Sequence, residues 1–168
     1  MLPVMNTLEE RIGTLLVEHD LTVGTVESAT GGLISHRLTG VPGSSDYYLG
    51  SIISYSNEIK TGIVGVKTDS IARYGAVSAT VAKQMAGGGR RLFGVDICLA
   101  DTGIAGPGGG SANKPVGLFY LGFACKEGTF SRKHIFTGDR AMNKQAAAET
   151  ALKWLEDYLS KKWVPGLS

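Results

Sequence analysis

The sequence predicts an α/β fold, a single domain with a mixed central sheet of about five or six strands covered by helices on both faces. Three observations predict it. Short β-branched or apolar runs alternate with stretches of helical spacing. The 168-residue length fits one domain, and 43% apolar residues suffice to cover a sheet on both faces. Late in the chain, two strand-like runs follow each other closely, as in a hairpin, so part of the sheet should be antiparallel.

The first half of the chain alternates helices and strands. A helix is expected from Thr7, whose capping box with Glu10 marks its start, to about Asp20. The expected elements that follow are a strand at Thr22–Val26, a helix at Thr30–Leu38 entered through Gly31 and Gly32, a loop at 40–45, a strand at Tyr48–Tyr55, a short helix at Asn57–Val64 and a helical stretch around Ile71.

The second half begins with a longer helix, capped by Ser78 and running through Leu92. Three glycines at 87–89 fall inside it, and since each costs roughly 1 kcal/mol relative to alanine, this segment should be frayed or closely packed. A strand at Val95–Thr102 and a hairpin of 116–125 with 129–136 come next. The last helix starts after Asp139 and has helical spacing of the apolar residues Ala147, Ala151, Trp154, Leu155 and Tyr158.

Composition and charge exclude several classes of function. Lys and Arg number 17 against 15 acidic residues, and a net charge of +2 is too small for a typical nucleic-acid or membrane binder. Cys98 and Cys125 lie far apart without nearby histidines, which argues against a metal site and a disulfide framework and predicts two buried thiols. Because no apolar run reaches about 18 residues, we expect a soluble, cytoplasmic protein.

The stretch T-V-E-S-A-T-G-G-L-I-S, residues 25–35, places Ser28 where a strand gives way to a helix. Its hydroxyl would lie near helix N-terminal N–H groups that stabilise negative charge, which suits a nucleophile. The alternative is that Ser28 or Thr30 only caps the helix. A serine nucleophile needs a base, and His36 is the nearest histidine in sequence. It lies about 9 Å of helical rise beyond Thr30, which is too far for it to accept the Ser28 proton. His19 and His134 have no motif around them, so a Ser-His-Asp triad has little support.

Tyr55 and Lys60 follow the second strand, and neighbouring parallel strands deliver their carboxyl ends to one edge of a sheet. Ser28 and Tyr55 are therefore expected to converge. A partly desolvated Lys60 would have a lowered pKa and could accept the serine proton, directly or through Tyr55. An exposed lysine and a core tyrosine are the alternative reading.

A glycine-rich loop follows the third strand, where small residues let successive N–H groups face an anion. The residues proposed to hold a phosphate there are Thr102, Gly103, Gly106 and Gly108, with Gly109 and Gly110 beside them. The loop matches neither the ATPase nor the dinucleotide fingerprint, and a plain flexible loop is the alternative. Arg140, next to the helix cap Asp139, could reach the same phosphate or be a surface charge.

Six blocks in order resemble one family. They are E-S-A-T-G-G-L-I-S-H-R-L-T, P-G-S-S-D-Y-Y-L-G-S-I-I-S-Y-S-N-E-I-K, G-A-V-S, T-G-I-A-G-P-G-G-G, K-P-V-G and G-D-R, and they span nearly the whole chain. The sequence resembles the C-terminal domain of the competence-induced protein CinA, whose stand-alone members are nicotinamide-nucleotide amidohydrolases. The resemblance implies an α/β/α sandwich over residues 1–168, homo-oligomers, and no metal or organic cofactor.

The resemblance also implies an activity, hydrolysis of the carboxamide of nicotinamide mononucleotide to give nicotinate mononucleotide and ammonia. Ser28 corresponds to the family's nucleophile, and Ser45, Tyr55 and Lys60 lie in the blocks that complete the catalytic site. In this interpretation the N–H groups around Thr30, Gly31 and Gly32 hold the oxyanion. The glycine loop, Thr102 and Arg140 hold the phosphate and ribose of the nucleotide.

Two positions depart from the family pattern, as does the run of glycines at 87–89, where a single glycine is expected. Members commonly have Cys where this chain has Ala29, and a small or apolar residue where it has Asp101. A carboxylate at 101 would repel a phosphate, or it could pair with Lys60 or Arg140. Glu27 is expected to support the site by orienting either Lys60 or a backbone N–H. The alternative function is therefore a catalytically silent pyridine-nucleotide-binding module. A third, which rests on the family resemblance alone, is an oligomeric interaction domain acting with a separate nucleotide hydrolase.

Overall fold

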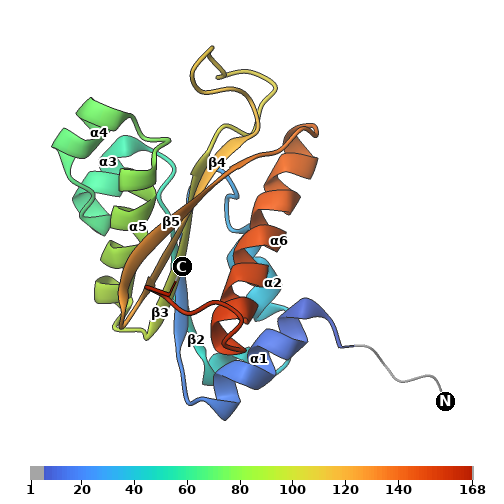
Figure 1. The fold of residues 1–168 in the computed structure, drawn as a ribbon. Coiled ribbons are helices and arrows are strands. Elements are labelled where there is room, and N and C mark those ends of the chain that lie inside the picture. The colour runs from blue at the N-terminus through green and yellow to red at the C-terminus, as the bar shows by residue number, and fades with distance from the viewer. Residues whose placement is uncertain (1–5, 168) are drawn as a thin grey trace.

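The computed structural model describes residues 6–167 and places one five-stranded sheet between two layers of helices (Figure 1). The strands are β1 (Val23–Glu27), β2 (Tyr48–Ile53), β3 (Ile97–Gly103), β4 (Leu118–Cys125) and β5 (Gly128–Ile135), in the spatial order β2-β1-β3-β4-β5. β1 pairs in parallel with β2 and β3, whereas β4 is antiparallel to β3 and β5. The predicted mixed sheet is confirmed.

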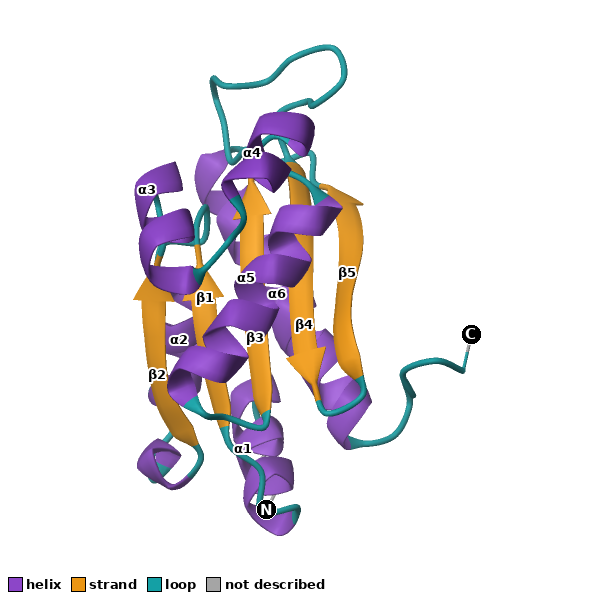
Figure 2. Ribbon diagram, turned by 90° about the vertical axis from the view of Figure 1, so that its left-hand side faces the viewer, coloured by secondary structure: helices purple, strands orange, loops and turns teal. Residues whose placement is uncertain are grey.

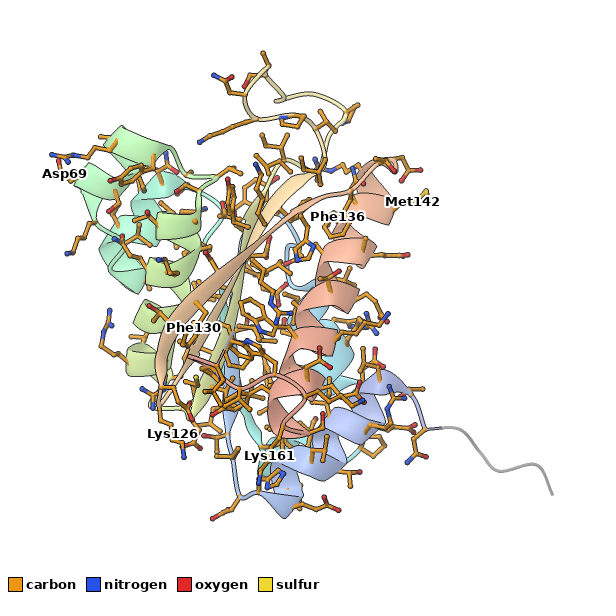
Figure 3. The ribbon with its side chains drawn as sticks, viewed as in Figure 1. Asp69, Lys126, Phe130, Phe136, Met142 and Lys161 are labelled. Atoms are coloured by element: carbon orange, nitrogen blue, oxygen red, sulfur yellow. The ribbon has the colours of Figure 1, made fainter. Side chains whose placement is uncertain are left out.

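Helices cover both faces of the sheet, which confirms the α/β/α sandwich. One layer contains α1 (Leu8–Glu18), α2 (Leu33–Thr39) and α6 (Arg140–Leu159), and the other contains α3 (Asn57–Ile59), the π-helical turn η2 (Lys60–Val64), α4 (Thr68–Tyr74) and α5 (Ala79–Phe93). Each layer buries its own apolar cluster against the sheet, one around Phe123 and Trp154 and the other around Val26 and Met85. In Figure 3 side chains fill the space on both sides of the sheet.

The ends of the elements differ from the predicted ones for local reasons. The capping box of Thr7 and Glu10 is present, as predicted. Helix α2 begins at Leu33 rather than Thr30 because Gly31 and Gly32 have φ angles of +62° and +100°, in the left-handed region that interrupts a helix. The short helix after β2 divides into α3 and the wider turn η2.

The three glycines at 87–89 lie in the buried face of α5 and are closely packed, one of the two predicted outcomes. A Cβ at Gly88 would overlap the backbone oxygen of Val64 at the end of η2, and one at Gly89 would overlap the side chains of Val26 and Cys98. Fraying is wrong, because these glycines allow α5 to approach the sheet and η2 closely. Helix α5 thereby supports the turn that carries Lys60.

The cap of α6, its buried face and the buried cysteines agree with the predictions from the sequence. Asp139 caps α6 by accepting from the Met142 N–H at 2.9 Å, and Cys98 and Cys125 are buried free thiols. Of the five apolar positions expected to face the core from α6, four are buried and Tyr158 is half-buried. Within residues 6–167, none of the helices combines the length and apolar character needed to cross a bilayer.

The topology brings three strand ends to one edge. The arrowheads of β1, β2 and β3 point the same way in Figure 2, toward the edge over which the β3–β4 loop projects. The chain leaves β1 through α2 on one face and reaches β3 through α5 on the other. The carboxyl ends of β1 and β3 therefore flank a topological switch point, where α/β sheets hold their ligands.

Candidate active site

A cleft of about 290 Å³ lies at this edge of the sheet. Its walls come from the segments after β1, β2 and β3, from residues 76–77 and from the start of α6. The cleft is lined by Ser28, Ala29, Tyr55, Asn57, Lys60, Ala76, Val77, Thr102, Gly103, Ile104, Ala105, Gly106, Gly108, Gly109 and Arg140. Eight residues that the sequence singled out for catalysis or ligand binding thus share one cavity.

Ser28 and Lys60 form the chemical centre of the cleft. Lys60 Nζ lies 2.9 Å from Ser28 Oγ, and it also donates to the carbonyl oxygen of Ser54 and, at 3.4 Å, to that of Tyr55. The lysine is only 1% exposed. Its place depends on the chain after β2, where the Ser56 side chain caps α3 through the Ile59 N–H and η2 begins at Lys60.

The surroundings of Lys60 favour its neutral form. Burial lowers the pKa of Lys60 below its ordinary value, and the negative charge of Asp101 opposes part of this effect. A neutral lysine amine has two N–H bonds and one lone pair. The two carbonyl oxygens of Ser54 and Tyr55 can accept the N–H bonds, which leaves the lone pair facing the Ser28 hydroxyl. The geometry therefore suits a base that takes a proton from Ser28.

Glu27 supports the helix entrance rather than Lys60. Its fully buried carboxylate accepts from the N–H groups of Gly32, Ile34 and Ser35 at 2.9, 3.1 and 2.7 Å. Helix α2 has no side-chain cap of its own at Gly32, so Glu27 takes that role from the end of β1. Glu27 was expected to orient either Lys60 or a backbone N–H, and it binds backbone N–H groups.

Asp101 lies under the Ser28–Thr30 turn and is fully buried. It accepts from the N–H groups of Ser28 and Thr30 at 3.0 and 3.1 Å and from the Thr30 hydroxyl. Burial raises the pKa of Asp101 to about 6. The expected pairing with Lys60 or Arg140 is wrong, since Asp101 makes neither contact and lies outside the cleft lining.

Three residues predicted to bind substrate lie outside the cleft. The Thr30 and Gly32 N–H groups donate to Asp101 and Glu27, and that of Gly31 donates to the Ser28 carbonyl. These groups are therefore not free to hold an oxyanion, and that prediction is wrong. In segment 28–32, as far as the described residues go, only the Ala29 N–H donates to no protein group, and Ala29 lines the cleft.

Ser45 is also not part of this site. It is exposed in the 3₁₀ turn η1 (Ser44–Asp46), which precedes β2, whereas Tyr55 and Lys60 follow β2. Because β1 and β2 run parallel, with Glu27 opposite Ile53, Ser45 lies at the opposite end of the sheet from Ser28. The prediction of a catalytic Ser45 is corrected for this chain.

Tyr55 and Arg140 meet at the mouth of the cleft. Arg140 donates to the Tyr55 hydroxyl at 3.3 Å and to the Gly106 carbonyl at 2.8 Å. The Tyr55 side chain is 64% exposed, and its hydroxyl contacts neither Ser28 nor Lys60 among the described residues. A proton path through Tyr55 is therefore unsupported. Together, the two side chains present a cation and a phenol to a ligand at the mouth.

The glycine loop after β3 lies beside this cation. Gly103 has no room for a Cβ because Phe119 packs against it, and Gly106 has a φ of +91° and packs against Val116. No protein group within the described residues accepts from the N–H groups of Ala105, Gly106, Gly108, Gly109 or Gly110. The Thr102 hydroxyl donates to the Ala76 carbonyl at 2.9 Å and joins the end of β3 to the cleft wall. This loop offers unpaired N–H groups to an anion.

Sequence patterns did not point to every residue of the site. The carbonyl oxygens of Ser54 and Tyr55 that hold Lys60 belong to the backbone, which carries no side-chain signal. Asn57, Ala76 and Val77 also line the cleft. They lie in the blocks Y-S-N-E-I-K and G-A-V-S that carry the family resemblance, but no role was predicted for them.

The fold and the cleft together define an α/β/α sandwich protein with a buried serine–lysine pair at the carboxyl edge of its parallel strands. Residues 5–159 match the family model described as the CinA C-terminal domain. The chain belongs to this family.

Relatives agree with this assignment. The CinA-like protein of Salinibacter ruber is 49% identical over 147 residues, covering 88% of this chain and 36% of that protein. That of Leptospira borgpetersenii serovar Hardjo-bovis (strain L550) is 47% identical over 153 residues, covering 90% and 37%. The chain therefore spans little more than a third of the length of these relatives.

Solved structures show the same fold. The competence/damage inducible protein CihA from Agrobacterium tumefaciens has a TM-score of 0.86 and 39% identity, covering 88% of this chain and 91% of that chain. The CinA superfamily protein KP700603 from Klebsiella pneumoniae has a TM-score of 0.88 and 28% identity, covering 93% and 97%.

Proposed function

We propose that this chain is an amidohydrolase that converts nicotinamide mononucleotide to nicotinate mononucleotide and ammonia. The observation that carries the proposal is the 2.9 Å contact between Ser28 Oγ and the buried Lys60 Nζ in a cleft bordered by unpaired N–H groups and Arg140. The nicotinamide and its nucleotide come from the family resemblance, and the chemistry of the cleft supports them.

The first half of the reaction forms an ester on Ser28. Neutral Lys60 accepts the Ser28 proton as Oγ bonds to the carboxamide carbon, and the carbonyl oxygen becomes an oxyanion. The Ala29 N–H, directly after the nucleophile, is the donor proposed to stabilise it. Lys60 then gives its proton to the amide nitrogen, the C–N bond breaks, and ammonia leaves. No cofactor takes part in this proposal.

The second half releases the product. Lys60 is neutral again and accepts a proton from a water molecule that attacks the ester carbon. The bond to Ser28 Oγ breaks, the proton returns from Lys60 to Ser28, and nicotinate mononucleotide is released. The carbonyl oxygens of Ser54 and Tyr55 keep Lys60 Nζ in place through both halves.

The phosphate of the ligand is proposed to bind at the mouth of the cleft. Arg140 is a permanent cation there, and the N–H groups of Ala105, Gly106, Gly108, Gly109 and Gly110 are donors without protein acceptors in the described chain. Asp101 does not contact this phosphate in the proposal, because it is buried under the Ser28–Thr30 turn and lies outside the cleft lining. A homo-oligomer belongs to the same proposal, since the edge strand β2 leaves Leu49 and Ile53 half-exposed.

The test is ammonia release from nicotinamide mononucleotide, with product identified by mass, together with calorimetric binding of the same compound. The proposal expects both binding and release. The control His36→Gln, at an exposed position outside the cleft lining, should behave as the wild type. Binding without release would favour the silent nucleotide-binding module. If the protein neither binds the compound nor releases ammonia from it, both functions are rejected.

A further inference from the structure

The buried hydroxyl of Thr30 lies between two carboxyl groups. Its Oγ1 is 2.6 Å from Glu27 Oε2 and within hydrogen-bond distance of Asp101 Oδ1. A threonine hydroxyl has one proton and can donate only one of these two bonds. The other bond needs a proton on a carboxyl group. The three side chains therefore form a site that can hold one additional proton.

Glu27 and Asp101 differ in how well their negative charge is compensated. Glu27 accepts from three backbone N–H groups at the start of α2, whereas Asp101 accepts from two. Glu27 is therefore the better stabilised carboxylate, and Asp101 is the group that takes up the proton. Burial, with the charge of Glu27 adding to it, raises the pKa of Asp101 to about 6.

The charged groups that act on Asp101 come from two elements. Glu27 lies at the end of β1, and Lys60 lies in η2. On the other side of β3, strand β4 places the uncharged Leu121 opposite Asp101. Asp101 also accepts hydrogen bonds from the N–H groups of Ser28 and Thr30, so it is hydrogen-bonded to the backbone of the proposed nucleophile.

We propose that Asp101 is a positioning residue of the Ser28–Lys60 pair: it holds the Ser28–Thr30 turn through two backbone bonds, and its charge sets the pH range in which Lys60 can accept a proton. An ionised Asp101 stabilises the ammonium form of Lys60 and therefore opposes its action as a base. Removing that charge should make Lys60 a base at lower pH. The proposal concerns the same serine–lysine pair as the proposed function and rests on it for its activity readout.

The experiment compares wild type, Asp101→Asn and the control Asp69→Asn over the pH range 5 to 10. Asp69 projects from α4 at the outside of the molecule, and its side chain is 85% exposed (Figure 3). Two readouts are recorded, the pH profile of kcat/KM for ammonia release and the titration of Lys60 by NMR of ¹³Cε-labelled lysine. The Lys60 signal is assigned with Lys60→Arg.

The proposal expects the Lys60 titration and the acidic limb of the profile to move to lower pH by about one pH unit in Asp101→Asn and to stay in place in Asp69→Asn. An unmoved Lys60 titration in folded Asp101→Asn would overturn it. If wild type releases no ammonia, the proposed function fails while the NMR titration still decides this inference. If Asp101→Asn does not fold, the wild-type Lys60 signal should show an additional inflection near pH 6 from Asp101, and its absence overturns the proposal.

Discussion

Replacing Gly88 by alanine tests how α5 supports the turn that carries Lys60. The added Cβ would overlap the backbone oxygen of Val64, the last residue of η2, and α5 and η2 would have to separate by roughly 1 Å. Overpacking of this kind costs about 1–3 kcal/mol, and the better helix propensity of alanine returns about 1 kcal/mol. We expect a net loss of up to about 2 kcal/mol in the free energy of unfolding.

The same displacement should impair the proposed chemistry. Val66 donates its N–H to the Lys60 carbonyl, so a shift of η2 also moves Lys60 relative to Ser28. A misplacement of about 1 Å can cost about 10²-fold in rate. Urea unfolding and ammonia release are measured for Gly88→Ala beside Gly62→Ala, where a Cβ meets nothing within 4 Å. A Gly88→Ala protein with wild-type stability and rate would refute the reasoning about this contact.

Three further outcomes are expected. Lys60→Met should lower kcat for ammonia release by about 10²–10⁴-fold with binding of the nucleotide retained in calorimetry, and wild-type turnover would exclude Lys60 as the base. Arg140→Ala should raise KM for nicotinamide mononucleotide more than for nicotinamide riboside, which lacks the phosphate, and equal changes would remove the phosphate from this site. Because burial raises the pKa of Asp101 from 3.8 to about 6, the folded state binds its proton more tightly, so this group's stabilisation is lost as pH rises from about 4 to 6. In wild type, this group should lower the free energy of unfolding by on the order of 3 kcal/mol between pH 4 and pH 6, and Asp101→Asn should lack that contribution. Urea unfolding at both pH values measures it, and the same pH dependence in both proteins would contradict the prediction.

Local patterns predicted much of the fold. The capping box of Thr7 and Glu10 and the spacing of Ala147, Trp154 and Leu155 each depend on residues close in sequence, and the structure has them as expected. The meeting of Ser28 with Lys60 followed from one topological rule, that parallel strands end at one edge.

The parts of the site that were predicted wrongly depend on buried contacts that the spacing of residues along the chain does not show. Thr30 has the sequence context of an N–H donor at a helix start, but Asp101, more than 70 residues away, accepts from it. The Gly32 N–H is accepted by Glu27, which is close in sequence but is buried at the end of the preceding strand. Spacing along the chain does not reveal which buried carboxylate will compete for a backbone N–H. Ser45 was placed by motif alone, and the parallel pairing of β1 with β2 puts it at the other end of the sheet.

Ammonia release by Ser28→Ala tests the central claim most directly. Wild type, Ser28→Ala and the control Ser160→Ala, altered at an exposed position after α6, are assayed with nicotinamide mononucleotide at equal protein concentration. We expect release by wild type and Ser160→Ala, and a loss of at least about 10³-fold in Ser28→Ala with nucleotide binding retained. Release by Ser28→Ala at the wild-type rate would show that Ser28 is not the nucleophile and would contradict the account.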